Sequence, residues 1–191
     1  MQVVPTVTPP STKAGPPEIS PIRNEDEASA GGRQNVVWVN LMNCAATGNS
    51  LRKSSGRDGV MDAGARSQQM IASDDGYVEF TVTEANKTRY CGLTRNEATI
   101  DSADMDFAIK LTAGGVAEVR ENNDYAVETS YRSGDRFRIA IEGRAVKYYK
   151  NDRLFFTNLK QSAHPLYIVA TFVNLNAAIS YVVISTAPTR P

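Results

Sequence analysis

The sequence contains very little of the chemistry on which most enzymes depend. Only one of its 191 residues is histidine and only two are cysteine. A nucleophilic Ser-His or Cys-His site would have a single candidate base, His164, and a zinc site needs more nitrogen and sulfur ligands than the chain offers. Phosphate-binding Gly loops, dinucleotide-binding fingerprints and metalloprotease motifs are absent. Because it precedes Pro165, we expect His164 to be a turn residue.

The chain also lacks an excess of charge and a long apolar run. Lys plus Arg and Asp plus Glu both number 21, so the formal net charge is zero and no long-range field favours nucleic acid or an anionic membrane. No apolar run approaches the roughly 18 residues of a membrane span, and the N-terminus lacks the pattern of a signal peptide. We therefore expect no nucleic acid partner and no membrane insertion. Near-neutral charge also permits self-association.

The two cysteines, Cys44 and Cys91, leave two states open. They can form one disulfide or remain as two buried thiols. Free cysteine is among the most commonly buried residue types, and both cysteines lie beside apolar, strand-like sequence. We favour two thiols in the core and keep the disulfide as the alternative.

Proline is concentrated at the start of the chain, where six of the nine prolines fall in the first 22 residues. Such sequence favours an extended backbone and disfavours helix and central strand. Residues 1–34 are therefore predicted to form an extended arm. The arm carries apolar residues that an idle linker would not need, and we expect them to contact a neighbouring subunit: Val3, Val4, Val7, Ile19 and Ile22.

Residues 35–186 are predicted to form one all-β domain, followed by a C-terminal tail at 187–191. Turn residues recur at intervals of about 8 to 12 residues, which is typical of a sandwich or barrel. The expected strands are 36–41, 50–54, 65–71, 77–83, 89–94, 106–111, 116–121, 125–131, 136–141, 146–150, 153–157, 166–173 and 178–184. So many strands do not fit one flat sheet, so we predict a two-sheet antiparallel β-sandwich, as in a jelly roll. One turn of helix is expected at most, in 96–102.

The clearest strand pattern lies in the meander 131–158. Phe137, Ile139 and Ile141 alternate with polar or small residues, the period of two that directs one face of a strand into a core. Two-residue turns are expected at 142–143 and 151–152, because Gly, Asn and Asp tolerate the positive φ that tight hairpin turns need.

The order of these motifs resembles that of a known superfamily. GYVEFTV, a CGL strand, DFAIKL, GDRFRIAIEGRAVKYYKNDRLFFTN and PLYIVATF are similar to the concanavalin A-like lectin/glucanase sandwiches, in particular a SPRY-like variant found in bacterial surface proteins. Asp152 replaces the glycine that is usual in one turn of this pattern. The resemblance implies a non-catalytic recognition or structural module with an extracellular or cell-surface location, since some relatives bind sugars and others bind peptides or proteins.

Aromatic and amide side chains in and beside the meander are the candidate ligand contacts. Aromatic faces stack on sugar rings and amides bond hydroxyl groups, so a saccharide platform is predicted at Tyr125, Tyr131, Tyr149 and Asn151. Alternation limits this prediction, because one member of each of the pairs 148–149 and 155–156 should face the core. Trp38 is expected in the core.

Asp104 and Asp106 are the remaining candidates for chemistry. They would share one face of a strand, which suits a pair of acids in a sugar-cleaving enzyme or two ligands for Ca²⁺. The pattern departs from the Glu-x-Asp-x-x-Glu arrangement of the concanavalin-like glycosidases. A polar strand entry explains the two aspartates more simply, so we expect no catalysis and no required cofactor, with calcium as an alternative.

These observations predict a non-catalytic structural or adhesive surface module. Its arm would mediate self-assembly in a filament, coat or appendage. The alternative is a monomeric carbohydrate-binding module with the arm as a tether, and a less favoured one is a glycoside hydrolase that uses Asp104 and Asp106. The expected partner is either a second copy of the chain or a glycan.

Overall fold

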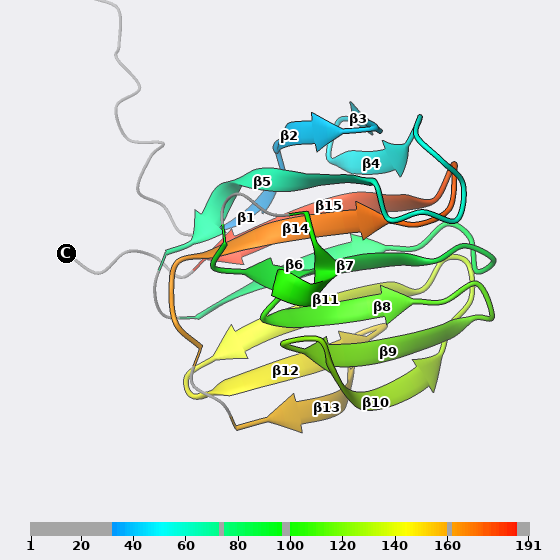
Figure 1. The fold of residues 1–191 in the computed structure, drawn as a ribbon. Helices are drawn as coiled ribbons and strands as arrows, with labels where there is room; N and C mark the ends of the chain where they lie inside the picture. The colour runs from blue at the N-terminus through cyan, green and yellow to red at the C-terminus, as the bar shows by residue number, and fades with distance from the viewer. Residues whose placement is uncertain (1–31, 73–74, 97–99, 160–161, 187–191) are drawn as a thin grey trace, which may run out of the picture.

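The structure, a computed structural model, describes residues 32–72, 75–96, 100–159 and 162–186. Within these residues it contains fifteen β-strands and one short 3₁₀ helix, so the predicted all-β class is confirmed (Figure 1). Among the same residues, no helix has the length and apolar character needed to cross a membrane. The arm residues 1–31, which include all five predicted anchors, and the tail 187–191 lie outside the described residues.

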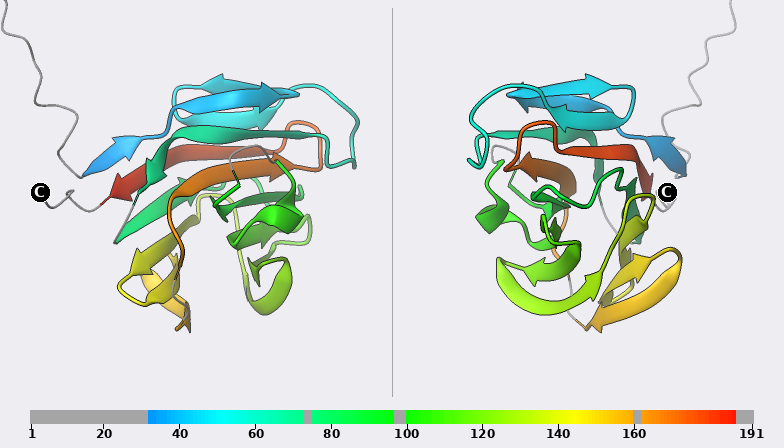
Figure 2. Two further views of the ribbon diagram at one scale, coloured as in Figure 1. Left: turned by 60° about the vertical axis from the view of Figure 1, so that its left-hand side comes forward. Right: turned by 90° about the vertical axis from the view of Figure 1, so that its right-hand side faces the viewer.

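The strands form two antiparallel sheets that pack face to face, as the views in Figure 2 show. The order in the eight-stranded sheet is β13 (Arg153–Asn158), β12 (Ala145–Lys150), β11 (Arg136–Glu142), β6 (Gly76–Thr81), β15 (Ala178–Thr186), β4 (Ser50–Lys53) and β3 (Cys44–Thr47), and β1 (Arg33–Asn35) pairs with β15. The order in the seven-stranded sheet is β10 (Asp124–Ser130), β9 (Val116–Glu121), β8 (Phe107–Leu111), β7 (Arg89–Thr94), β14 (Leu166–Phe172), β5 (Ala63–Ile71) and β2 (Trp38–Met42). The predicted two-sheet sandwich is confirmed.

The inward faces of the two sheets meet in one apolar core. Phe137, Ile139 and Ile141 of β11 are all buried there, as their alternation predicted, and Trp38 is buried as well. A sheet with one apolar face must cover that face with a second layer. The two sheets therefore stabilise each other.

Both hairpin turns of the meander form, but the first is displaced by one residue. Asn151 and Asp152 have φ values of 49° and 64°, the left-handed conformation that a type I′ turn requires at both central positions. The other turn consists of Gly143 and Arg144, because β11 continues through Glu142. The prediction of a turn at 142–143 was therefore wrong by one position.

Strict alternation fails at Phe155 and Phe156. Tyr148 is fully buried and Tyr149 is only half-buried, as expected. The pairing between β12 and β13 shifts register at this point, however, so β13 carries one extra residue in a β-bulge. Phe155 and Phe156 consequently both pack against the core. The prediction that only one of the two faces the core was wrong.

Three short elements also differ from the prediction. β1 and β3 were not expected, because three or four residues are too few to show a period of two. Since β1 pairs with β15, the sandwich begins at Arg33, inside the segment assigned to the arm. The helical turn expected in 96–102 is a 3₁₀ turn at Ser102–Asp104.

Cys44 and Cys91 are free thiols. Cys91 is fully buried in the middle of the seven-stranded sheet, whereas Cys44 is partly buried on β3, at the end of the other sheet. Burial raises the pKa of the Cys44 thiol to about 12 and also raises the pKa of Cys91. The structure therefore has the two thiols rather than the disulfide.

A buried lysine fixes the long connection between β4 and β5. The side chain of Lys53 has no exposed surface, and its ammonium donates hydrogen bonds to the carbonyl oxygens of Arg57, Val60 and Val173 at 2.7, 2.7 and 3.0 Å. It also contacts the carboxylate of Asp62 at 2.6 Å. A buried charge is costly unless it is paired and hydrogen-bonded. Three of the four oxygens belong to the loop 54–62 and one to the β14–β15 connection, so Lys53 holds these two segments together.

Replacement of this lysine should destabilise the fold. We expect Lys53→Met to lower the free energy of unfolding by about 3 kcal/mol, because three carbonyl groups and a carboxylate lose their donor. The control is Lys147→Met, whose pair with Glu142 lies at the surface and should change the stability much less. Chemical denaturation of the parent and both variants measures the difference, and equal stability of Lys53→Met and the parent would contradict the role of Lys53.

Candidate functional site

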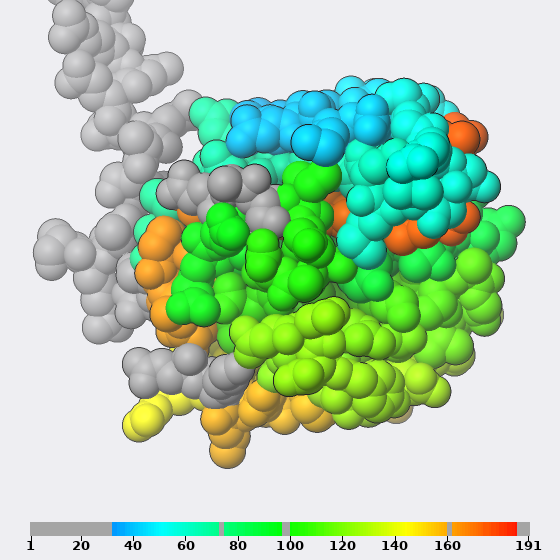
Figure 3. Space-filling view, viewed as in Figure 1, coloured from blue at the N-terminus to red at the C-terminus, as the bar shows by residue number. Residues whose placement is uncertain are grey.

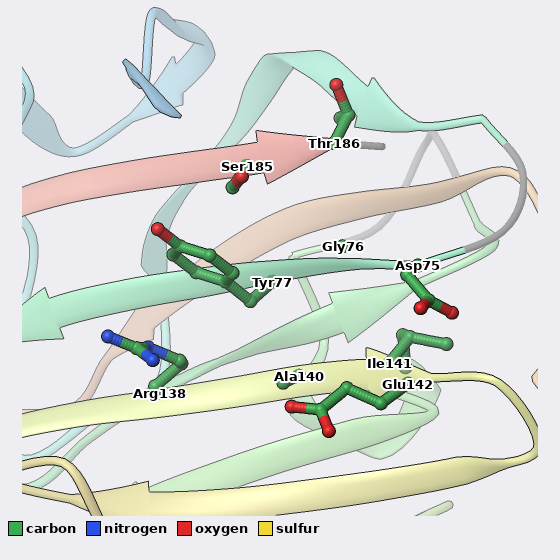
Figure 4. A pocket seen from close by; sticks show the side chains of 9 residues that line it. All are labelled: Asp75, Gly76, Tyr77, Arg138, Ala140, Ile141, Glu142, Ser185 and Thr186. Carbon is green, nitrogen blue, oxygen red and sulfur yellow. The ribbon is translucent and has the colours of Figure 1, made fainter. Parts of the chain in front are cut away.

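A hollow lies on the outer face of the eight-stranded sheet, at Ala140 (Figure 4). Ala140 on β11 pairs with Tyr77 on β6 and with Lys147 on β12. The next residues along β11 on the same face, Arg138 and Glu142, also have long side chains. A short side chain among long ones leaves a volume of about 290 Å³. The hollow therefore exists because position 140 is alanine.

The lining of the hollow combines an aromatic ring with charged and hydroxyl groups. Tyr77 and Arg138 bound one end, and Asp75 and Glu142 lie towards the other (Figure 4). Ser185 of β15 adds a hydroxyl group, since it pairs with Tyr77 across the strands. Three neighbouring strands thus bring these groups to one place.

Arg138 is held in a fixed orientation. Its guanidinium carbon lies 4.6 Å from the centroid of the Tyr77 ring and 5.8 Å from that of Tyr149, within the range of cation–π attraction. Its Nε and Nη2 donate hydrogen bonds to Oε2 of Glu79 at 2.9 and 2.5 Å. Burial alone would lower the pKa of Arg138, but the hydrogen bond to Glu79 and its charge raise it overall. Arg138 is therefore a stable cation at the edge of the hollow.

The carboxylate of Glu79 lies at the centre of an arginine cluster. Only 4% of its side chain is exposed, and it pairs with Arg33, Arg136 and Arg138 at 3.1, 3.5 and 2.5 Å. Asp152 pairs with the last two arginines from the β12–β13 turn. A carboxylate with so little access to water requires such partners. The Arg33 contact also joins β1 to the middle of the sheet.

Carboxylates at the other end of the hollow are hydrogen-bond acceptors with fixed positions. Glu142 accepts a hydrogen bond from the Tyr149 hydroxyl at 3.0 Å and pairs with Lys147 at 2.5 Å. Burial and this contact with Glu142 raise the pKa of Tyr149, so its hydroxyl stays protonated and donates. Asp75 accepts a hydrogen bond from the backbone N–H of Gly143 at 2.6 Å. The hollow thus offers oriented acceptors beside an aromatic ring.

The structure does not bring the four predicted ligand residues together. Tyr149 lies beside the hollow through its bond to Glu142. Tyr125 is 55% exposed but lies on β10, in the other sheet. Tyr131 is only 5% exposed, because its ring packs in the core and its hydroxyl donates to a backbone carbonyl.

Asn151 stabilises a turn with both ends of its amide. The amide nitrogen donates to Asp135 at 2.8 Å, and the amide oxygen accepts from the backbone N–H of Arg136 at 2.9 Å. These bonds connect the β12–β13 turn to the start of β11. The structure therefore gives Asn151 a structural role.

Asp104 and Asp106 line a separate polar hollow together with Arg95. Both carboxylate oxygens of Asp106 accept hydrogen bonds from Arg95, one from the side chain and one from the backbone, each at 2.9 Å. Within the described residues, no three or more His, Cys, Asp or Glu side chains form a group that could hold a metal ion. This pairing with arginine favours a structural role. The prediction that the two aspartates share one face of a strand was wrong, because Asp104 ends the 3₁₀ turn and Asp106 precedes β8. His164 lies just before β14, with its Nδ1 3.3 Å from a backbone oxygen.

Sequence reasoning missed Tyr77, Glu79 and Arg138. Glu79 and Arg138 are 59 residues apart in the chain and meet only because the β6–β11 register makes them partners. The available signal was the alternation in GYVEF, which places Tyr77 and Glu79 on the face opposite Val78 and Phe80. This alternation shows which face of the strand the two side chains occupy, but not which residues of other strands lie beside them.

Comparison with known proteins identifies the fold. No protein-family model and no curated protein sequence matches the chain. Among solved structures, the exoplasmic/lumenal domain of VIP36 has a TM-score of 0.60 at 10% identity, with 80% of this chain and 86% of that chain covered. The SPRY domain of human HERC1 has a TM-score of 0.54 at 16% identity, with 81% and 99% covered. The carbohydrate recognition domain of Emp47p has a TM-score of 0.55 at 7% identity, with 78% and 88% covered. The chain thus has the concanavalin A-like sandwich fold that the sequence motifs predicted.

Loss of the buried carboxylate should loosen β1. We expect Glu79→Gln to speed amide hydrogen exchange at 33–35 by about tenfold, because Arg33 loses its charged partner and this short edge strand opens more readily. Glu142→Gln is the matched control, since that carboxylate is exposed and does not contact β1. Unchanged exchange in Glu79→Gln would show that Arg33 does not hold the strand.

Proposed function

We propose that the protein is a non-catalytic carbohydrate-recognition module and that the hollow at Ala140 binds the sugar. The observation that carries this proposal is the combination of the Tyr77 ring with Arg138, Asp75 and Glu142 around one open space of about 290 Å³. Small-ligand sites typically combine an aromatic or apolar surface with a few oriented polar groups. A sugar ring has the same duality, with C–H faces and a rim of hydroxyl groups.

Each part of the lining suits one part of a saccharide. The Tyr77 ring offers a surface on which the C–H groups of a sugar ring can pack. The carboxylates of Asp75 and Glu142 accept hydrogen bonds from hydroxyl groups, and ionised acceptors form the stronger bonds of this kind. Arg138 donates to ring or hydroxyl oxygens. Since its guanidinium and the Glu142 carboxylate are already oriented by neighbours, little side-chain entropy is lost when a ligand binds.

The carboxylates support binding rather than hydrolysis. A glycosidase needs one carboxyl group that is held protonated and a second that stays ionised. Glu142 contacts Lys147 and the Tyr149 hydroxyl, and Asp75 accepts a backbone hydrogen bond, so both carboxylates already make structural contacts within the protein. We therefore infer a lectin-like role without bond cleavage.

The fold supports this proposal, because two proteins of similar fold recognise carbohydrate: Emp47p, through its carbohydrate recognition domain, and VIP36. One similar structure is the VIP36 domain in a Ca²⁺/Man3GlcNAc-bound form, with a TM-score of 0.58. Glycans are displayed mainly outside cells, so the proposal is consistent with an extracellular or cell-surface location. Self-assembly through the arm is a separate proposal that depends on a different surface.

Filling the hollow should abolish sugar binding without unfolding the protein. We expect the parent chain to bind members of a glycan array, and Ala140→Leu to weaken binding of the best array member by at least about tenfold, or about 1.4 kcal/mol. The control Ala126→Leu adds the same side chain at an exposed position of β10, in the other sheet, and should bind like the parent. Thermal unfolding of both variants checks that the fold is retained.

Two outcomes of this experiment would contradict the proposal. If the parent binds no glycan on the array, the proposal that the protein recognises carbohydrate is wrong. If Ala140→Leu binds as tightly as Ala126→Leu, the sugar site lies elsewhere on the sandwich.

A further inference from the structure

β2 is an open edge of the seven-stranded sheet and carries exposed apolar side chains. Among the described residues it pairs with β5 alone, and this pairing is interrupted between Val39 and Met42, where Asn40 has a φ of 55°. Three of the nine exposed large apolar side chains of the described part lie on β2 or directly before it, and we call them the β2 edge patch: Val37, Leu41 and Met42, which are 48, 44 and 51% exposed. Figure 3 shows the β2 segment, in blue, on the surface of the molecule. An unpaired strand with apolar side chains is a ready site for pairing with another chain.

The other open edges among the described residues lack this combination. β3 consists of a cysteine, two alanines and a threonine, so it exposes no large apolar side chain. β10 exposes one large apolar side chain, Tyr125, and β13 exposes one, Leu154. One of the three patch residues is a methionine, Met42, whose flexible side chain adapts to different partners. The β2 edge is therefore the surface best suited to accept a strand.

The arm contains a segment with the pattern of an edge strand. Residues 2–9 read QVVPTVTP. In an extended strand, alternate residues direct their side chains to opposite faces and their N–H groups to opposite edges. Pro5 and Pro9 have the same parity as Val3 and Val7, so the positions without an N–H can all face away from a partner strand. The same parity places Val3, Pro5, Val7 and Pro9 on one apolar face.

We propose that residues 3–9 of one copy add as a strand to β2 of a second copy, with Val3 and Val7 against the β2 edge patch. Main-chain hydrogen bonds would supply affinity, and the apolar contacts would fix the register, as in other strand-addition interfaces. The partner is thus a second copy of this chain. The proposal is independent of sugar binding, because the hollow lies on the other sheet.

The connection is long enough for the segment to reach a second copy. The 23 residues 10–32 separate this segment from β1 and span up to about 75 Å when extended. A domain of this size is only about 40 Å across. A connection that returned to its own β2 would need a fraction of that length. The formal net charge of zero also removes long-range repulsion between copies.

Charge placed on either side of the contact should break the assembly. In the full chain, we expect Val3→Asp with Val7→Asp to weaken self-association at least tenfold, because the apolar face of the segment is lost. The matched control is Thr6→Asp with Thr8→Asp, which adds the same charge on the opposite face and should associate like the parent. On the accepting side, Met42→Glu should weaken association, whereas Leu159→Glu, at an 85% exposed position, should not. Sedimentation velocity over a range of concentrations measures each effect.

Mixing two defective chains distinguishes exchange between copies from folding back onto the same copy. The Val3→Asp/Val7→Asp chain keeps an intact β2 edge, and the Met42→Glu chain keeps an intact arm. If arms are exchanged, the mixture forms a one-to-one complex although each chain alone is largely monomeric. The proposal is wrong if the parent chain is monomeric at every concentration, if the arm variant associates normally, or if the mixture stays monomeric.

Discussion

The outer face of the eight-stranded sheet depends on one nearly buried carboxylate. Glu79 has almost no access to water, so its charge must be neutralised by the guanidinium groups of Arg33, Arg136 and Arg138. These arginines come from β1 and β11, on either side of the strand that carries Glu79. Because Tyr77 and Tyr149 stack on Arg138, their ring positions follow from the same constraint. The end of the hollow formed by Tyr77 and Arg138 is therefore positioned by contacts within the sheet.

The sandwich itself could be predicted because its signals are local. β7 and β9 have the predicted bounds, Arg89–Thr94 and Val116–Glu121, since turn-forming sequence follows each strand and the period of two is clear within it. The failures have identifiable causes. The bulge at Phe155 depends on how β13 pairs with β12, which neither strand shows alone. β1 is a strand only because β15 has an unpaired edge beside it, so its three residues carry no pattern of their own.

The candidate site could not be predicted to the same extent, because it is defined by register between distant strands. Alternation assigns Glu79 and Arg138 to outward faces, but only the β6–β11 pairing makes them neighbours. The pairing between strands was also unknown for the predicted saccharide platform at Tyr125, Tyr131, Tyr149 and Asn151. Tyr131 and Tyr149 look equivalent in the sequence, yet Tyr131 faces the core and Tyr149 bonds Glu142 at the surface. The ring that lines the hollow, Tyr77, lies outside the meander in which the tyrosines were sought.

The two proposed surfaces belong to different sheets, and this separation has a functional consequence. The hollow lies over β6 and β11, whereas the β2 edge patch lies on the seven-stranded sheet. Strand addition at β2 would therefore leave the hollow of every copy open. A shallow, solvent-exposed sugar site has modest affinity by itself, since it removes little of its ligand from water. An assembly that presents several such hollows converts later binding events into intramolecular ones, which raises the overall affinity for a surface that displays many copies of one glycan. Self-assembly and sugar recognition would then be parts of one adhesive function rather than competing interpretations.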